Sequence, residues 1–200
     1  MPLSMMLWTR YDAVRLPAIL VVAACGAYDP GRAEEERLIV GGAFEAVCLA
    51  TVSADRSPEA IMASRDPLPR FARARPSADD VARSVTAKWI APYVGRATVT
   101  AGPRGSCTVA ALDPRDPILL RADALARVAA LEGPYTRTYG GVVNARGSTR
   151  DILCHQAMPD RARLVMLTTT AAPPSFFATT VSAEGTCQAL TDEADIAAPD

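Results

Sequence analysis

Leu164-Val165-Met166-Leu167 is the stretch that decides the fold, because it is apolar at four consecutive positions. Successive side chains of a β-strand point to opposite faces of the sheet, so a strand with this pattern is buried on both faces. Such a strand belongs in the middle of a sheet. We therefore expect the strand 162–170 to be central and to be covered by helices on at least one side.

The chain around this stretch has the pattern of an antiparallel sheet. From Tyr135 onward, short alternating segments are separated by glycine and proline, which is typical of a meander. Two earlier alternating segments flank a turn at Gly102-Pro103, which predicts a hairpin. The predicted strands are 96–101, 106–112, 135–143, 149–156, 162–170 and 176–183.

Two helices are predicted near the start of the chain. The segment 33–53 has apolar residues at helical spacing, and Gly41-Gly42 interrupts it and can divide it in two. Ser57 is suited to cap a second, short helix, with Pro58 in its first turn. The segment 66–76, which contains a cluster of arginines, is expected to be a loop.

Two further helices are predicted around the hairpin. Ser77 is expected to cap a helix that has Val81, Val85 and Trp89 on one face. Asp116 is expected to cap another, which ends at Gly133-Pro134. Together with the strands, these helices predict an α+β fold, in which N-terminal helices pack on a mostly antiparallel sheet built from a hairpin, a helix and a four-stranded meander.

The N-terminal segment has the pattern of a secretory signal. Arg10 and Arg15 precede the apolar run Leu16–Ala24, which is too short to span a bilayer as a helix, since that needs about 20 residues. Val22-Ala23-Ala24-Cys25 resembles the lipobox of bacterial lipoprotein precursors. The resemblance implies that Cys25 is lipidated and becomes the new N-terminus. Two other interpretations stay open: a signal cut near Ala27 that releases a soluble protein, and an ordinary buried strand or helix.

These patterns divide the chain into four parts. We expect a signal segment of the lipoprotein type at 1–25, a tether at 26–33, one α+β domain at 34–187 and an acidic flexible tail at 188–200. Apolar residues make up 50% of the sequence, which favours a globular domain over a disordered one.

Cysteine usage supports export. Besides Cys25, the chain has Cys48, Cys107, Cys154 and Cys187, an even number that allows three pairings. The spacings fit no zinc site, because there is no CxxC motif and only one histidine. We favour disulfides between Cys48 and Cys107 and between Cys154 and Cys187, each contributing about 3 to 4 kcal/mol. The alternative is four small buried apolar residues.

The composition argues against nucleic acid as a partner. Without residues 1–25, the net charge is −2, and the arginines are scattered along the chain. The sequence has none of the common nucleotide-binding, metalloprotease or serine-hydrolase motifs, so no cofactor and no metal are expected.

His155 is the only histidine, and its neighbour Cys154 invites comparison with a Cys–His dyad. On a strand, however, the two side chains point to opposite faces, so His155 shares a face with Asp151 and Leu153. We therefore expect a structural histidine and assign no catalytic residue.

The functional expectation is an exported, membrane-tethered protein of the cell envelope or periplasm with a non-catalytic binding or structural role. Its partners would be the membrane, through a lipid anchor, and an envelope protein or a small ligand. One alternative is an exported hydrolase or thiol-redox enzyme that uses a free cysteine with His155 or an aspartate. Another is a cytoplasmic domain with a false signal.

Overall fold

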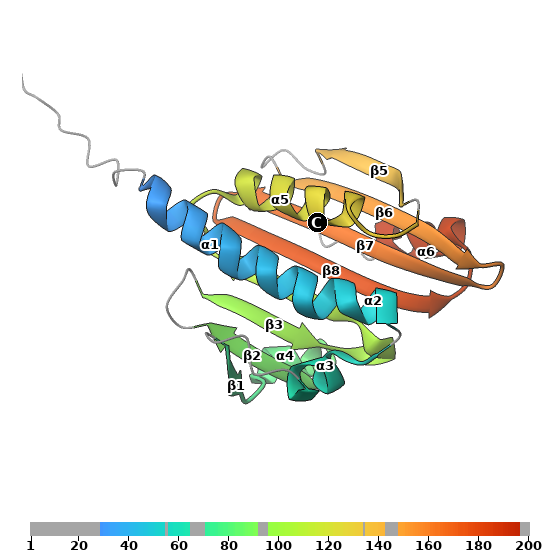
Figure 1. The fold of residues 1–200 in the computed structure, drawn as a ribbon, viewed down its shortest axis with the longest axis horizontal. Coiled ribbons are helices and arrows are strands. Elements are labelled where there is room, and N and C mark those ends of the chain that lie inside the picture. Colours follow the sequence, from blue (N-terminus) through green and yellow to red (C-terminus); the bar gives the residue numbers. More distant parts are fainter. Residues whose placement is uncertain are drawn as a thin grey trace, which may run out of the picture.

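The computed structural model describes residues 29–54, 56–64, 71–91, 96–133, 135–142 and 148–196. The signal-like segment, and with it Cys25, lies outside the described residues. The described residues form an α+β fold, in which helices pack on an eight-stranded antiparallel sheet (Figure 1). This confirms the predicted fold class.

The sheet has the strand order β1-β2-β3-β4-β8-β7-β6-β5, and all neighbours are antiparallel. Its strands are β1 (Ala72–Ala74), β2 (Ala87–Ala91), β3 (Ala97–Ala101), β4 (Cys107–Leu112), β5 (Thr136–Val142), β6 (Thr149–Met158), β7 (Arg161–Ala171) and β8 (Pro174–Glu184). β7 lies between β6 and β8, which confirms the central position that its apolar residues predict. The predicted hairpin and meander are also confirmed.

One long helical rod, Pro30–Ala54, crosses the sheet (Figure 1). It consists of α1 (Pro30–Ala43), a π-helical segment η1 (Phe44–Leu49) and α2 (Ala50–Ala54). The rod and α5 (Pro117–Ala129) lie beside each other on one side of the sheet, which we call the covered face. The rod is long and apolar enough to cross a membrane, and half of its apolar stretch is buried in the domain.

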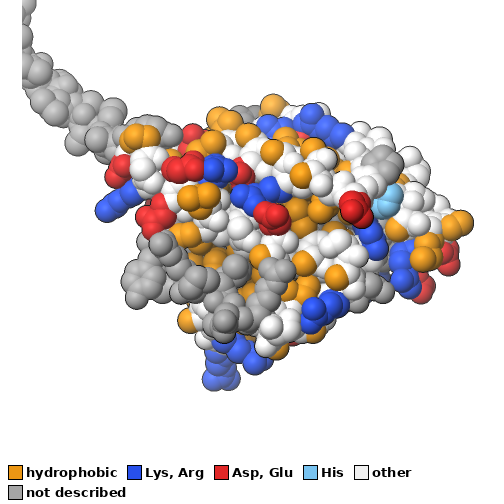
Figure 2. All heavy atoms as spheres, in the orientation of Figure 1, with side chains coloured by type: hydrophobic (Ala, Val, Ile, Leu, Met, Phe, Trp, Pro, Cys, Tyr) orange, Lys and Arg blue, Asp and Glu red, His pale blue; other side chains and the backbone are white. Residues whose placement is uncertain are grey.

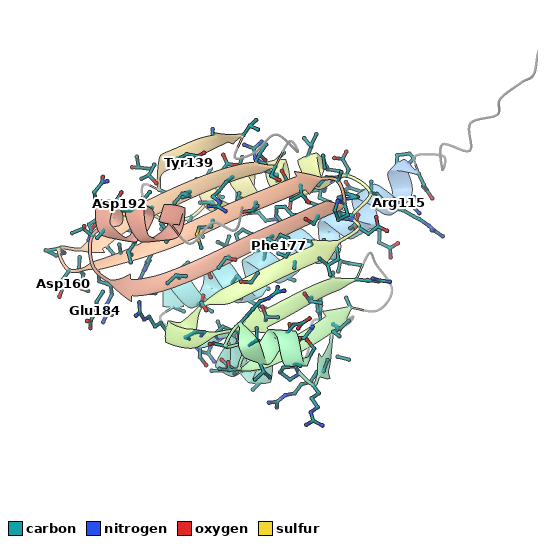
Figure 3. The ribbon with its side chains drawn as sticks, turned by 180° about the vertical axis from the view of Figure 1, so that it is seen from behind. Arg115, Tyr139, Asp160, Phe177, Glu184 and Asp192 are labelled. Carbon is teal, nitrogen blue, oxygen red and sulfur yellow. A yellow bond between two sulfur atoms is a disulfide. The ribbon has the colours of Figure 1, made fainter. Side chains whose placement is uncertain are left out.

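The other helices are α3 (Pro58–Ser64), α4 (Ala78–Ala82), the 3₁₀ turn η2 (Pro103–Gly105) and α6 (Cys187–Ile196). α6 packs against β6 and β7 on the side opposite the rod (Figure 3). We call this side the open face, because most of it carries no helix.

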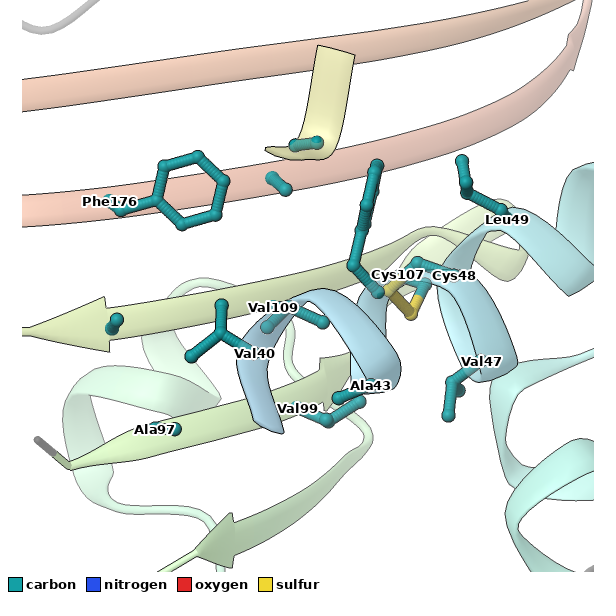
Figure 4. Close-up of a cluster of buried hydrophobic side chains, with 14 of the residues drawn as sticks. Val40, Ala43, Val47, Cys48, Leu49, Ala97, Val99, Cys107, Val109 and Phe176 are labelled. Atoms are coloured by element: carbon teal, nitrogen blue, oxygen red, sulfur yellow. A yellow bond between two sulfur atoms is a disulfide. The ribbon is translucent and has the colours of Figure 1, made fainter. Parts of the chain in front are cut away.

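The core lies between the rod and the covered face (Figure 4). Alternate residues of the strands point toward the rod, and each side chain labelled in the figure is at most 1% exposed. These residues are Val40, Ala43, Val47, Cys48, Leu49, Ala97, Val99, Cys107, Val109 and Phe176. Burial of this apolar surface is the main stabilising contribution to the domain.

The rod continues through Gly41-Gly42 and does not divide there. A Cβ atom on Gly41 would lie 2.8 Å from Nε of Arg127 on α5, which is closer than van der Waals contact. The glycine therefore leaves room for the side chains of Asp123 and Arg127 against the rod. The irregular geometry comes directly after it, in η1.

The two halves of the domain have the same topology, although the sequence has no recognisable repeat. In each half a helix precedes four antiparallel strands, β1 to β4 after the rod and β5 to β8 after α5. The last strands of the two halves pair with each other, with Cys107 opposite Thr180 and Leu112 opposite Ser175. The pairing of β4 with β8 therefore joins the halves into one sheet.

Both expected disulfides are present. Cys48–Cys107 ties the rod to β4 across 59 residues, and Cys154–Cys187 ties β6 to α6 across 33 residues. By loop-closure entropy each contributes about 4 kcal/mol. Two disulfides indicate an oxidising, exported environment.

The helix predicted after Ser77 is shorter than expected. Ser77 and Asp80 form a capping box, but α4 ends at Ala82 and Trp89 lies in β2. The prediction was wrong because the spacing from Val81 to Trp89 fits a helix. The buried, alternating pattern of β2 fits a strand, and its pairing with β3 decides the outcome.

Three other segments also differ from the expectation. The expected loop 66–76 contains the edge strand β1, whose three residues are too few to show an alternation. The rod begins at Pro30, capped by Asp29, inside the expected tether. The segment 188–196, expected to be an acidic tail, belongs to α6, which the disulfide at Cys187 holds against the sheet.

Candidate functional site

His155 and Cys154 lie on opposite faces of β6, as expected. Cys154 faces α6 and forms a disulfide with Cys187. His155 stacks against Tyr135, with ring centroids 5.4 Å apart, and packs closely on Gly133, where a Cβ atom would lie 2.9 Å from the imidazole ring. The histidine therefore supports the connection between α5 and β5.

The described part of the chain offers no thiol nucleophile and no metal-binding cluster. All four cysteines within it are in disulfides, and no group of three His, Cys, Asp or Glu side chains there is placed to hold a metal ion. Asp80 completes the capping box of α4 with Ser77, and Asp116 caps α5. Both carboxylates have structural roles.

Sequence reasoning missed a buried ion pair on the covered face. Asp151, which is 0% exposed, accepts hydrogen bonds from Arg121 of α5, one of them 2.9 Å long, and from Arg137 of β5. Burial alone would raise the pKa of Asp151, but the two arginines outweigh it and lower the pKa. The carboxylate therefore stays ionised and holds α5 and β5 against β6.

A second ionic cluster joins the rod to α5. Asp123 accepts from Arg37 of α1 and, at 2.6 Å, from Nε of Arg127, which also contacts Glu45. Figure 2 shows acidic and basic side chains beside one another over these two helices. Both ionic clusters bind elements of the domain together.

The open face is different, because it contains a groove. The groove has a volume of about 540 Å³ and lies between α4, with the residues that follow it, and the outer side of β2, β3, β4 and β8. Its size is in the range of pockets that bind small molecules. Figure 3 shows Phe177 on this face, between α6 and the strands of the first half.

The strand register gives the groove a polar end and an apolar end. Lys88, Thr100 and Thr108 are successive partners across β2, β3 and β4. Two residues further along, Thr98, Ala110 and Phe177 form the next row across β3, β4 and β8. Leu112, which is 41% exposed, ends the groove on the apolar side.

The polar end carries an ion pair and an additional cation. Nζ of Lys88, the only lysine in the chain, donates to Oδ2 of Asp80 at 2.7 Å. The hydrogen bond from Lys88, followed by those from Ser77, lowers the pKa of Asp80 to about 2. Arg83 lines the same end, is exposed, and makes no side-chain hydrogen bond or ion pair with any described residue. The polar end therefore carries two positive charges against one negative charge.

Sequence reasoning did not find this groove. The threonines of β3 and β4 alternate with buried residues, which is also what ordinary half-buried strands do. The one available signal was the position of the only lysine within an otherwise apolar strand.

Comparison of the chain with protein-family models, with curated proteins and with solved structures found no match.

Proposed function

We propose that this protein is an exported envelope protein, anchored to a membrane by a lipid on Cys25, and that it binds a ligand without transforming it. The observation that carries the binding role is the groove on the open face. One end of it is lined by charged groups and the other by apolar side chains, and the Arg83 guanidinium faces no acidic partner among the described residues.

The anchor would place the domain close to the membrane. Four residues separate Cys25 from Pro30, where the rod begins. A chain of this length spans at most about 18 Å, because each residue extends by about 3.6 Å. The N-terminal end of the rod would therefore face the bilayer, and the opposite end of the sheet would face away from it.

Residues of the apolar end of the groove lie at the same end of the domain. Glu36, in the second turn of the rod, accepts a hydrogen bond of 2.9 Å from the backbone N–H of Arg115. Arg115 lies three residues after Leu112, and Figure 3 places it beside the start of the rod. In the anchored protein, the groove would thus run from the membrane side, at Leu112, toward Lys88.

The anchor is tested by the intact mass of the protein from membrane and soluble fractions, with thiols alkylated before and after reduction. We expect a membrane-bound product that begins at Cys25, carries acyl mass and gains four alkyl groups only after reduction. Cys25→Ser should abolish the acyl mass. A full-length soluble product that alkylates at five thiols would instead support a cytoplasmic domain, and a thiol other than Cys25 that alkylates without reduction would support a thiol enzyme.

The binding role is tested by filling the groove. Thr98→Trp places a large side chain in its floor, whereas Val142→Trp places the same side chain at an exposed position on β5, outside the groove. The rate at which an amine-reactive acetyl ester labels Lys88 reports on groove occupancy. An extract of the producing cells' envelope should slow this labelling in the wild type and in Val142→Trp, but should have no further effect in Thr98→Trp. Equal rates with and without extract in the wild type would contradict the binding role.

A further inference from the structure

We infer that the ligand of this groove is an organic anion with an apolar chain or ring, bound with its charged group between Arg83 and Lys88 and its apolar part over Ala110, Phe177 and Leu112. This inference rests on the proposed binding role of the groove. It adds the chemical class of the ligand and its direction in the site.

The polar end selects a negative charge. Asp80 is ionised, and its Oδ2 atom is already occupied by Lys88 and by both donors of Ser77. The ion pair with Lys88 leaves the charge of Arg83 without compensation. A carboxylate or phosphate can accept two parallel hydrogen bonds from a guanidinium. Such a pair of bonds to Arg83 is the strongest interaction that the polar end can make with a ligand at neutral pH.

The apolar end selects a hydrophobic group. Phe177 and Ala110 form the floor beyond the threonine row, and Leu112 is exposed at the end of β4. The charged residues that line the groove, Asp80, Arg83 and Lys88, all belong to the other end, so a ligand's negative charge would gain no partner here. The charge distribution therefore fixes the direction in which an anionic ligand with an apolar part lies.

The length of the site suits a medium acyl chain or a fused ring system. Thr108 lies in the row of Lys88, and Leu112 is four residues further along the same strand. At about 3.3 Å per residue, the charged and apolar ends are about 13 Å apart. Between the two ends, the half-buried Thr98 and Thr100 present hydroxyl and methyl groups, which can contact polar and apolar ligand atoms respectively.

Two kinds of ligand combine an anionic group with an apolar part of this length: a fatty acid released from the membrane and a soluble aromatic acid. We therefore use decanoate and 2-naphthoate as probes. Acetate serves as an anion without an apolar part, and decanol as a chain without a charge. The full-length protein is held in phosphatidylcholine vesicles, which contain no primary amine, and acetylation of Lys88 is followed by peptide mass spectrometry.

We expect decanoate, 2-naphthoate or both to slow acetylation of Lys88 about tenfold when the probe concentration is about ten times its Kd, because only the empty site reacts. Acetate and decanol should leave the rate unchanged. Whichever of the two acids protects Lys88 more strongly at equal concentration identifies the source. The same probe should also raise the Tm of the protein, which provides a readout that does not depend on the amine.

Two variants, each with a matched control, test the polar end and the apolar end of the groove separately. Arg83→Ala should weaken probe binding about tenfold or more, since a hydrogen bond to a charged group is lost, while Arg73→Ala, at an exposed arginine of β1, should not. Phe177→Thr should weaken binding of the apolar part. Ile118→Thr, at an exposed position on α5, should leave it unchanged.

The inference is overturned if decanol protects Lys88 as well as decanoate, if acetate does, or if Arg83→Ala binds the probes like the wild type. If no probe protects Lys88 or raises the Tm while the envelope extract still protects, the ligand class is wrong but the binding role stands. If neither the probes nor the extract protect, both proposals fail.

Discussion

The two faces of the sheet are made from the same strands but have opposite properties. On the covered face, small and apolar side chains pack under the rod and α5, and the carboxylates of Asp123 and Asp151 are paired with arginines. On the open face, the same strands present threonines, Phe177 and the only lysine, and α6 covers only the part over β6 and β7. Period-two alternation lets one strand carry both sets of side chains, so the core and the groove lie on different faces of the same strands.

Phe176 and Phe177 test this division most directly, because they are neighbours on β8. Phe176 is 1% exposed in the core, whereas Phe177 is half-buried on the open face. We expect Phe176→Ala to lower the free energy of unfolding by about 3 to 5 kcal/mol, since it removes a large core side chain and leaves a cavity. Phe177→Ala should lower it by about 1 kcal/mol or less. Urea unfolding measures both changes in the free energy of unfolding. Equal changes would show that the covered face does not contribute more to stability than the open face.

The two disulfides allow a second comparison, because Cys48–Cys107 lies on the covered face and Cys154–Cys187 lies on the open face. Cys48→Ala with Cys107→Ala should lower the free energy of unfolding by about 3 to 4 kcal/mol, and amide protection should fall throughout the core. Cys154→Ala with Cys187→Ala should affect mainly the amides of α6 and the strands beneath it, because that helix packs mainly on β6 and β7. Hydrogen exchange with mass spectrometry distinguishes the two patterns. A uniform loss in the second variant would contradict the prediction.

A feature of the fold could be predicted from the sequence when the residues that determine it lie within one segment of the chain. The four apolar residues Leu164–Leu167 predicted a central strand, because the signal lies within the strand itself. With Cys25 set aside, three disulfide pairings were possible, and the favoured one is present. Trp89 was misplaced because its spacing from Val81 fits a helix, while the competing signal, pairing with β3, comes from another segment.

Neither the groove nor the buried ion pair could be predicted, because each depends on contacts between separate segments of the chain. Arg83, Lys88 and Thr98 come from three segments that only the strand register and the short α4 helix bring together. Asp151 lies 30 residues from Arg121, so its partner becomes evident only when α5 packs on β6. Local propensity contains no information on such contacts.

Asp151 also gives the covered face a pH dependence. Its folded-state pKa is lowered, so its contribution to stability is fully present above the unfolded pKa of about 3.9 and is lost as the pH falls through the folded pKa. We expect Asp151→Asn to lower the free energy of unfolding by about 2 kcal/mol at pH 7, since it removes a buried charge that pairs with two arginines. The variant should lose less stability than the wild type between pH 7 and pH 3.

The matched control is Asp160→Asn, at an exposed position in the turn between β6 and β7 (Figure 3). It should leave both the stability and its pH dependence close to those of the wild type. A variant Asp151→Asn whose pH dependence matches the wild type would show that the carboxylate does not hold α5 and β5 in place.

A small effect on stability is also expected on the open face, at Asp80. Asp80→Ala removes the capping box of α4 and the partner of Lys88, and should lower the free energy of unfolding by about 1 kcal/mol. Because the lysine then loses the carboxylate that holds its amino group in a hydrogen bond, its acetylation should become faster. Asp79→Ala, in the same turn but outside the capping box, should change neither quantity. If Asp80→Ala destabilised the protein as strongly as Phe176→Ala, the polar end of the groove would be part of the folding core, and a binding role would not explain its charges.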